Sequence, residues 1–191
     1  MKSLRLSAIF FGVIALAALL ACTPLHAADS SQTSKTAADT LLPKDQRKAA
    51  PEFSLTGADG KPVALANYRG KVVLLDFWAT WCGGCKLEIP WYMEFDTKYK
   101  REGLAVIGVS MDDDGWKAVK PFLAQTRDPE TGGNTAMKYP VVIGNETLAK
   151  QYKLTSMPMT LLIDREGKIA LSHTGVVNKD DFEGHIRQLL R

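Results

Sequence analysis

Cysteine and histidine, common ligands of zinc, are scarce in this chain of 191 residues, which contains three of each. A structural zinc site takes about four ligands. The sequence has one Cys-x-x-Cys pair, at Cys82 and Cys85, and its histidines, His26, His173 and His185, are scattered. It therefore predicts no metal site, and we expect no other cofactor.

An excess of one charge is also lacking. The formal net charge is +3 at pH 7, and removing the positive charges of Lys2 and Arg5, which lie in a segment expected to be cleaved, leaves +1. This balance gives no reason to expect a nucleic-acid partner. No internal repeat is visible, and the length and composition suit one globular domain with appendages.

An apolar run long enough to span a membrane is missing as well. Residues 6–21 are predominantly apolar and follow Lys2 and Arg5, but a spanning helix needs about 20 residues. We interpret residues 1–27 as an export signal, cleaved after Ala27 where small residues follow Pro24. An uncleaved membrane anchor is the alternative.

Cys22 offers a second interpretation of the N-terminus. The stretch from residue 18 to Cys22 reads Ala-Leu-Leu-Ala-Cys and resembles a bacterial lipoprotein box. The signal would then end at residue 21, and a lipid on Cys22 would attach the protein to a membrane. In both interpretations the protein works outside the cytoplasm, in the periplasm, where disulfides form readily.

Large apolar residues are almost absent from residues 28–50, a composition that predicts a flexible linker before a domain at residues 51–191. Within the domain, apolar runs alternate with amphipathic segments, which predicts an α/β fold with a central mixed sheet covered by helices on both faces. An N-terminal β-hairpin is expected to turn at 58–61, with strands at 72–77, 104–110, 139–143, 159–164 and 169–172. Helices are expected from 85 onward and at 116–125, 147–152 and 179–190, and a loop at 126–138.

The two cysteines of this domain lie where a strand is predicted to turn into a helix. The first turn of a helix favours an anion, here a thiolate. Cysteines three residues apart can close a small disulfide ring, and in such motifs the pKa of the first thiol falls from about 8.5 to roughly 3.5–7.5. Cys82 is therefore the predicted nucleophile and Cys85 the resolving thiol. A purely structural disulfide is disfavoured because so short a loop removes little chain entropy.

An acidic run, Asp112, Asp113 and Asp114, follows the predicted strand at 104–110. It lacks the ligand spacing and the distal glutamate of an EF-hand calcium loop. We interpret it as a loop in which an aspartate caps the following helix.

Several motifs together resemble one known family. They are Phe77-Trp78-Ala79-Thr80-Trp81-Cys82-x-x-Cys85, Pro90 five residues later, an inserted αβ segment between Trp116 and Ile143, and Met157-Pro158 before Met159-Thr160-Leu161-Leu162-Ile163-Asp164. On these residues the chain from about residue 50 resembles the TlpA/ResA family of exported thioredoxin-like thiol-disulfide oxidoreductases. The resemblance implies an enzyme with a thioredoxin-like fold, an N-terminal hairpin and an αβ insertion, acting as a monomer.

The resemblance also implies roles for individual residues. Pro158 would be a cis-proline beside Cys82 that leaves the backbone of Met157 free to pair with an extended substrate peptide, although the residue alone is equally compatible with a trans turn. Trp81 would shield the dithiol, or else only pack in the core. These three residues, Trp81, Met157 and Pro158, are the predicted substrate-binding residues.

Two acidic residues complete the predicted site. Asp76 matches a buried acid that accepts the proton of the resolving thiol, unless its side chain reaches solvent or a lysine. Glu88 matches a glutamate that shifts thiol pKa values, or is an ordinary exposed helix residue. One departure is Gly84, since the family usually has proline before the second cysteine, and the redox potential therefore does not carry over.

The resemblance implies the reaction and the partners. The protein would be a reductase of protein disulfides, with apocytochrome c cysteines as candidate substrates in cytochrome c maturation and a membrane thiol transporter as the reductant. One alternative is a peroxiredoxin-type thiol peroxidase, but Leu75 and Ala79 replace the proline and threonine of its motif. The other is a copper-binding assembly factor, for which His173 is the only candidate imidazole.

Overall fold

The computed structural model describes residues 40–125 and 137–191. The predicted signal, Cys22, most of the predicted linker and most of the predicted loop at 126–138 lie outside these residues. Within the described part of the chain, no helix has the length and apolar character needed to cross a membrane.

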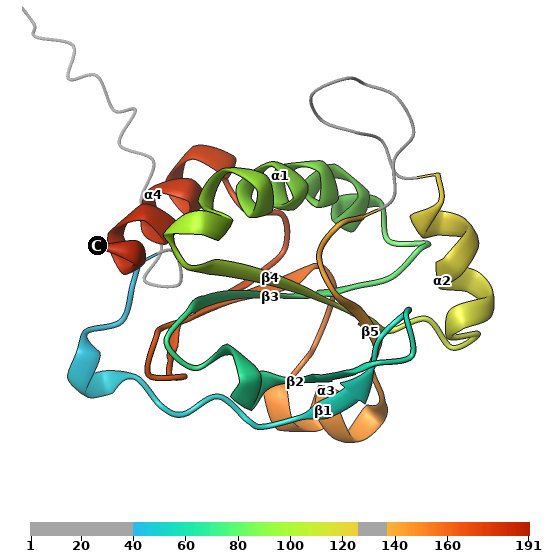
Figure 1. Cartoon of the computed structure of the whole chain (residues 1–191), viewed down its shortest axis with the longest axis horizontal. Coiled ribbons are helices and arrows are strands. Elements are labelled where there is room, and N and C mark those ends of the chain that lie inside the picture. The colour runs from blue at the N-terminus through green and yellow to red at the C-terminus, as the bar shows by residue number, and fades with distance from the viewer. Residues whose placement is uncertain (1–39, 126–136) are drawn as a thin grey trace, which may run out of the picture. The chain divides into compact units, whose positions relative to one another are not determined.

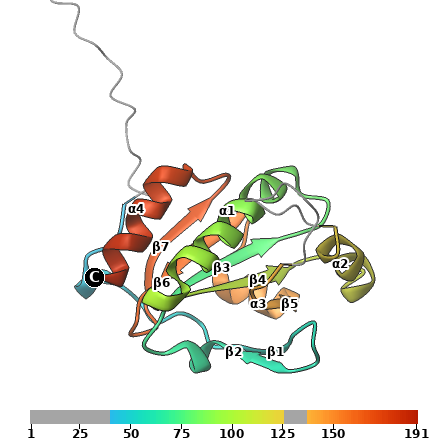
Figure 2. The ribbon, with the colours of Figure 1, turned by 45° about the horizontal axis from the view of Figure 1, so that its top comes forward.

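Two buried strands form the centre of a five-stranded sheet. They are β3 (Val72–Trp78) and β4 (Leu104–Ser110), which pair in parallel, and every residue in both is buried. Continuous apolar runs of this kind are typical of strands covered on both faces. The order is β5-β4-β3-β6-β7, with β5 (Val141–Ile143) parallel to β4, β6 (Met159–Ile163) antiparallel to β3, and β7 (Ile169–Thr174) antiparallel to β6 (Figure 2).

Helices cover both faces of this sheet, as the sequence predicts. The helices α1 (Gly83–Tyr99) and α4 (Lys179–Leu190) lie on one face, and α3 (Glu146–Tyr152) lies on the other with the hairpin of β1 (Ser54–Thr56) and β2 (Pro62–Ala64) (Figure 1). The helix α2 (Trp116–Leu123) lies beyond the β5 edge. Short 3-10 turns occur at Lys44–Gln46, Leu65–Tyr68 and Lys100–Glu102.

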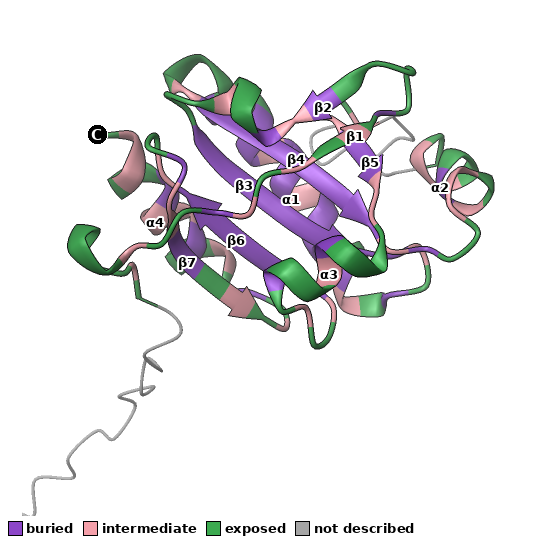
Figure 3. Ribbon diagram, turned by 90° about the horizontal axis from the view of Figure 1, so that it is seen from below, coloured by how far each residue is buried: buried purple, intermediate pink, exposed green. Residues whose placement is uncertain are grey.

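The alternation of side chains along β3 divides the core into two layers. Leu74 and Trp78 pack beneath α1 and α4, whereas Leu75 and Phe77 pack toward α3 and the hairpin. Seen from the hairpin side, the buried strands β3, β4 and β6 run through the middle of the molecule (Figure 3). Asp76 shares the face of Leu74 and Trp78, which places a carboxylate under α1.

The ordered contacts begin before residue 51, where the sequence predicts the domain to start. The Leu42 N–H donates to the Ala170 carbonyl at 2.8 Å, and Ala50 is buried with its N–H bonded to the Gly167 carbonyl. Arg47 forms an ion pair with Asp164 at 3.0 Å. The last ten residues of the predicted linker therefore pack along β7 and the turn before it, because backbone hydrogen bonds stabilise them where apolar side chains are few.

Candidate active site

The cysteine pair lies at the junction of β3 with α1, as predicted from the sequence. Cys82 and Cys85 form a disulfide with their Cα atoms 5.3 Å apart. Cys82 is the N-cap residue of α1, and the Cys85 N–H donates to Cys82 Sγ at 3.2 Å. Cys82 is 6% exposed, whereas Cys85 is completely buried. A helix N–H directed at Cys82 Sγ would stabilise a thiolate there, which suits a nucleophile.

The loop that precedes Cys82 is held by Asp112. Its carboxylate accepts hydrogen bonds from the Thr80 N–H at 2.9 Å, the Thr80 hydroxyl at 2.5 Å and the Ser110 hydroxyl at 2.8 Å. The prediction that an aspartate of this run caps the next helix is wrong, since the N-cap of α2 is Gly115 and has no side-chain cap bond. The reason is that the buried Asp112 carboxylate already accepts hydrogen bonds from Thr80 and Ser110, which follow β3 and end β4.

Pro158 lies against the first turn of α1. The Met157–Pro158 peptide bond is cis, as the resemblance implied, so the trans alternative is wrong. The Pro158 carbonyl accepts a 2.9 Å hydrogen bond from the Gly175 N–H, which attaches the segment after β7. Met157 is partly buried and packs on the core beneath α1.

Gly84, the departure from the family motif, lies directly against this proline. A Cβ atom at residue 84 would lie 2.8 Å from Val176 Cγ2 and 3.1 Å from Pro158 Cδ, whereas one at Gly83 would meet nothing within 4 Å. Real Cβ atoms do not approach other atoms as closely as 2.8 Å. A side chain at residue 84 would therefore require Val176 or Pro158 to shift.

Trp81 is 67% exposed, so the alternative that it only packs in the core is wrong. Leu87 and Val176 are also large apolar residues with exposed side chains. Leu87 lies on the first turns of α1, and Val176 lies against Gly84 beside the second cysteine. Exposed apolar side chains near the disulfide offer contact area to a protein substrate.

Asp76 is 1% exposed, and neither carboxylate oxygen has a hydrogen-bond partner among the described residues. Burial raises the pKa of Asp76 well above its usual value, and the nearby charge of Glu88 raises that pKa further. The alternative in which this side chain reaches solvent or a lysine is therefore wrong.

Glu88 is fully buried, so it is not an ordinary exposed helix residue. One oxygen, Oε1, accepts a 2.7 Å hydrogen bond from the Val177 N–H, and the other has no partner among the described residues. Burial raises the pKa of Glu88 to about 7, against the opposing effect of the Val177 hydrogen bond. Since Glu88 follows Cys85 by three residues, both side chains lie on one face of α1.

Two buried hydroxyls lie in the same layer and were not identified from the sequence. The Tyr92 hydroxyl and Thr160 Oγ1 are 2.8 Å apart. Thr160 is the cross-strand partner of Asp76, and Tyr92 follows Glu88 by four residues on α1. The spacing of four residues between Glu88 and Tyr92 predicts that they share one face of a helix. The pairing of β3 with β6, which brings Thr160 to this layer, cannot be predicted from the local sequence.

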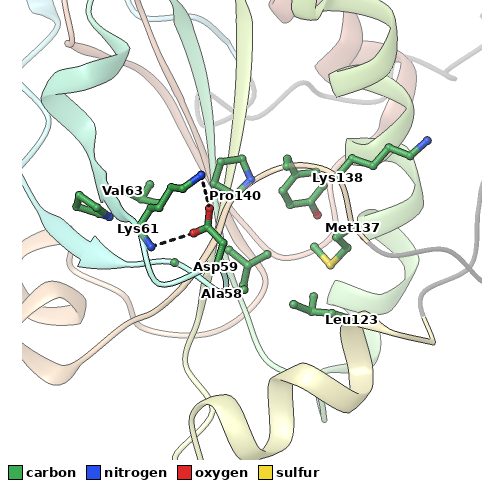
Figure 4. A pocket seen from close by; sticks show the side chains of 12 residues that line it. Ala58, Asp59, Lys61, Val63, Leu123, Met137, Lys138 and Pro140 are labelled. Atoms are coloured by element: carbon green, nitrogen blue, oxygen red, sulfur yellow. Dashed lines mark hydrogen bonds and ion pairs between the residues drawn. The ribbon is translucent and has the colours of Figure 1, made fainter.

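A separate cavity lies between the hairpin turn and the segment before β5 (Figure 4). Its volume is about 400 Å³, and Asp59 and Lys61 pair at its rim. None of the predicted site residues lines it. Elsewhere in the described residues, no group of three or more His, Cys, Asp or Glu side chains is arranged to hold a metal ion.

Known proteins resemble this chain in both sequence and structure. The model of the AhpC/TSA family matches residues 47–172. The thiol-disulfide oxidoreductase ResA of Bacillus cereus is 34% identical over 143 residues, which are 74% of this chain and 77% of that protein. A Chlorobium tepidum structure described as thiol:disulfide interchange protein DsbE matches with a TM-score of 0.67 and 34% identity, covering 76% of this chain and 97% of that chain. The exposed lipoprotein thioredoxin of Streptococcus pneumoniae matches with a TM-score of 0.57 and 26% identity, covering 73% of this chain and all of that one.

Proposed function

Because the chain belongs to the AhpC/TSA family and is a thiol-disulfide oxidoreductase with a thioredoxin-like fold, we propose that it works as a reductase of protein disulfides. The observation that carries this proposal is the Cys82–Cys85 disulfide at the start of α1, with the Cys85 N–H directed at Cys82 Sγ. In this reading Cys82 is the nucleophile and Cys85 is the resolving thiol.

The reaction is thiol-disulfide exchange in two steps. The Cys82 thiolate attacks one sulfur of the substrate disulfide, and the other substrate sulfur leaves as a thiolate. Cys85 then loses its proton to Asp76 and attacks Cys82 Sγ, which breaks the mixed disulfide and releases the second substrate thiolate. The substrate gains two electrons, and Cys82 and Cys85 are left as the disulfide that the structure contains.

The electrostatics of the site support the direction of this reaction. Asp76 and Glu88 are buried in the layer beneath α1 that also holds Cys85. A carboxylate near a thiol disfavours the thiolate. Strong oxidants of this class have a stabilised reduced form, so acids that destabilise the thiolate favour a reductant. Glu88 would thus shift the thiol pKa values upward and make the reduced pair a stronger reductant.

The substrate is proposed to bind as an extended peptide across the exposed edge of the disulfide. The backbone of Met157 would pair with it, next to Pro158, while the exposed Trp81 ring would cover the reacting sulfurs and contact apolar side chains. Trp81, Met157 and Pro158 are then the substrate-binding residues.

The cellular setting follows from the N-terminal sequence. Residues 1–27 would direct the chain to the periplasm, as a monomer, with residues 28–50 preceding the catalytic domain at 51–191. Lipidation of Cys22 would instead anchor it to a membrane, and the similarity to an exposed lipoprotein thioredoxin supports this option. A membrane thiol transporter would re-reduce the pair, and apocytochrome c cysteines are the proposed substrates in cytochrome c maturation.

The test is reduction of a disulfide-linked protein, such as insulin, by the reduced exported protein. We expect reduction of the substrate by the natural chain, none by Cys82→Ser, and a trapped mixed disulfide on Cys82 in Cys85→Ser. Equal activity of Cys82→Ser and the natural chain would contradict the proposal. Hydrogen peroxide and Cu(I) titrations in the same preparation test the peroxidase and copper-binding alternatives, with His173→Gln as the variant specific to copper.

A further inference from the structure

A second cavity, with more cations than acids in its lining, lies between the start of the described chain and the end of α4. Its volume is about 370 Å³. The charged residues that line it are Lys44, Arg47, Asp164, Arg165, Glu166 and Arg191. Leu41, next to the first described residue, also lines it. The segment that enters the domain and the C-terminus therefore meet at this cavity.

The sheet separates this cavity from the cysteine pair. Arg165 donates a 2.9 Å hydrogen bond to the Gly70 carbonyl, just before β3 begins at Val72. The cysteines follow the other end of β3, after Trp78. A strand of seven residues is about 20 Å long, at about 3.3 Å per residue. The C-terminus and the turn at Lys44–Gln46 lie at one end of the domain (Figure 1), and the disulfide lies at the opposite end of the sheet.

The two acids of the cavity are already paired with cations. Asp164 forms an ion pair with Arg47 at 3.0 Å, and both side chains are largely buried. Glu166 forms an ion pair with Lys168 at 2.8 Å. The negative charges of this lining are thus matched within the protein.

Three cations of the cavity are not matched by an acid. Among the described residues, the Arg165 guanidinium donates to three backbone carbonyls, those of Gly70, Glu102 and Leu190. The Lys44 and Arg191 side chains are exposed and contact no acid within the described part of the chain. The terminal carboxylate of Arg191 offsets one of these charges, so a positive excess remains.

Two further lysines enlarge this excess. Lys48 and Lys71 are exposed at the same end of the sheet, and neither has an acidic partner in residues 40–125 or 137–191. The exposed acids at this end that likewise have no cationic partner there, Asp45 and Glu102, are fewer. We call Lys44, Lys48, Lys71, Arg165 and Arg191 the cationic end.

An exposed apolar side chain accompanies these cations. Four large apolar residues of the described chain have exposed side chains, and three of them, Trp81, Leu87 and Val176, belong to the disulfide region. The fourth is Leu42, which is 37% exposed and whose carbonyl accepts a hydrogen bond from Arg47 Nε. Cations beside an exposed apolar side chain are typical of surfaces that bind at a lipid headgroup layer.

We propose that the cationic end binds an anionic membrane surface, so that the disulfide faces away from the membrane. The donors of Arg165 are used on carbonyls and the lysines are spread over separate segments, so this end offers diffuse charge. It lacks the convergent donors that bind a single phosphate, and diffuse charge suits a lipid surface.

The entry point of the chain supports the same partner. Eighteen residues separate Leu41 from Cys22, the proposed lipidation site, and they span at most about 60 Å. A tether of that reach would keep the domain near a membrane without setting its orientation, which the cationic end would then set. The inference goes beyond the proposed function and needs only the proposed export of the chain.

The experiment measures binding to lipid vesicles by sedimentation. The protein is residues 28–191, the chain after the proposed cleavage, which contains every described residue and no lipid. The vesicles are phosphatidylcholine alone or phosphatidylcholine mixed with phosphatidylglycerol. The test variant is Lys44→Glu/Lys48→Glu/Arg191→Glu. Arg165 is left in place because its hydrogen bonds to three carbonyls hold the fold together.

The matched control is Lys117→Glu/Lys120→Glu/Lys153→Glu. These three lysines are exposed on or next to α2 and α3, away from the cationic end. The control has the same net charge as the test variant, so the two differ only in where the charge lies. Urea unfolding and the insulin assay show whether both variants are folded and active.

We expect the natural chain to bind the anionic vesicles and not the neutral ones. The test variant should bind at least tenfold more weakly, since each cation near an anionic surface strengthens binding about fivefold. The control should keep most of the binding. Binding of the natural chain should weaken as salt rises from about 0.05 M to about 0.5 M, because salt screens exposed charges. Both variants should reduce insulin at the natural rate.

Four results overturn the inference. They are no binding of the natural chain to anionic vesicles at low salt, equal binding to neutral vesicles, equal losses in the two variants, and release of the bound protein by soluble glycerol phosphate. The last result would identify a site for one phosphate group instead of a surface. Failure of the natural chain to reduce insulin would refute the proposed function and leave the vesicle result standing.

Discussion

The Val177 N–H donates a 2.7 Å hydrogen bond to Glu88 Oε1, which ties the segment after β7 to α1 at the level of the cysteine pair. The same segment bonds Pro158 through the Gly175 N–H, and Val176 between them packs against Gly84. This hydrogen bond of Glu88 therefore holds the segment that flanks the dithiol, and the proposed effect of Glu88 on the thiol pKa values is separate from it.

Replacing Glu88 with glutamine should flatten the dependence of stability on pH. Because the folded pKa of Glu88 is about 7, the folded state binds this proton more tightly than the unfolded chain does. Stability should therefore fall as pH rises from the unfolded pKa toward 7, by about 3 kcal/mol for this group. Glutamine retains the acceptor for Val177 but does not titrate.

Urea unfolding of the oxidised protein at pH 5 and pH 8 measures this difference. The matched control is Glu94→Gln, also on α1, which removes an acid paired with Lys179 and should leave the natural pH dependence in place. A Glu88→Gln variant whose stability still falls as steeply as that of the natural chain would contradict the assignment.

Asp76→Asn should separate stability from activity. Since burial raises the pKa of Asp76, ionisation of this group costs stability, and the variant should gain stability relative to the natural chain as pH rises. The same change should slow resolution by Cys85, because asparagine accepts no proton. Unfolding curves and stopped-flow rates from one preparation give both quantities. Loss of stability at high pH, or an unchanged rate, would argue against the acceptor role.

Asp112→Ala should loosen the loop before Cys82. The change leaves the Thr80 N–H, the Thr80 hydroxyl and the Ser110 hydroxyl without their acceptor, at an expected cost of about 3 kcal/mol in unfolding free energy. We also expect slower attack by Cys82. The neighbouring Asp113 is exposed, so Asp113→Ala is the control, and similar losses in the two variants would refute the bracing role.

Gly84→Ala should impair the protein, whereas Gly83→Ala should be tolerated. The added methyl group at residue 84 would meet Val176 and Pro158, and at residue 83 it would meet open space. Overpacking of this kind typically costs about 1–3 kcal/mol. The Gly84→Ala/Val176→Ala double variant should recover part of the loss in chemical denaturation. Equal stability of the two single alanine variants would rule out this packing explanation.

The elements with strong local signals were predictable from the sequence. The strand Leu104–Ser110 and the helix Lys179–Leu190 have the predicted bounds, because apolar runs and amphipathic periods are properties of the segment itself. The strand at 139–143 is shorter than predicted and begins at Val141. The junction that holds Cys82 and Cys85 was likewise readable, since a strand and a helix meet there.

Contacts between distant segments account for what was missed. Asp112 bonds Thr80 across two parallel strand ends, and Thr160 meets Tyr92 only because β6 pairs with β3 beneath α1. The packing of Ala50 depends on a carbonyl at Gly167. None of these partners lies close in sequence, so residue type and spacing alone could not specify them.

The reduction potential of the Cys82–Cys85 pair distinguishes a reductase from a donor of disulfides. The exported protein is equilibrated with glutathione or dithiothreitol buffers of known potential, and the free thiols are then quantified. We expect a low value, near the roughly −270 mV of thioredoxin, as is typical of a reductase. A value near the roughly −120 mV of a strong periplasmic oxidant would mean that the protein donates disulfides. That result would contradict both the proposed reduction of substrate disulfides and the proposed role of the protein in cytochrome c maturation.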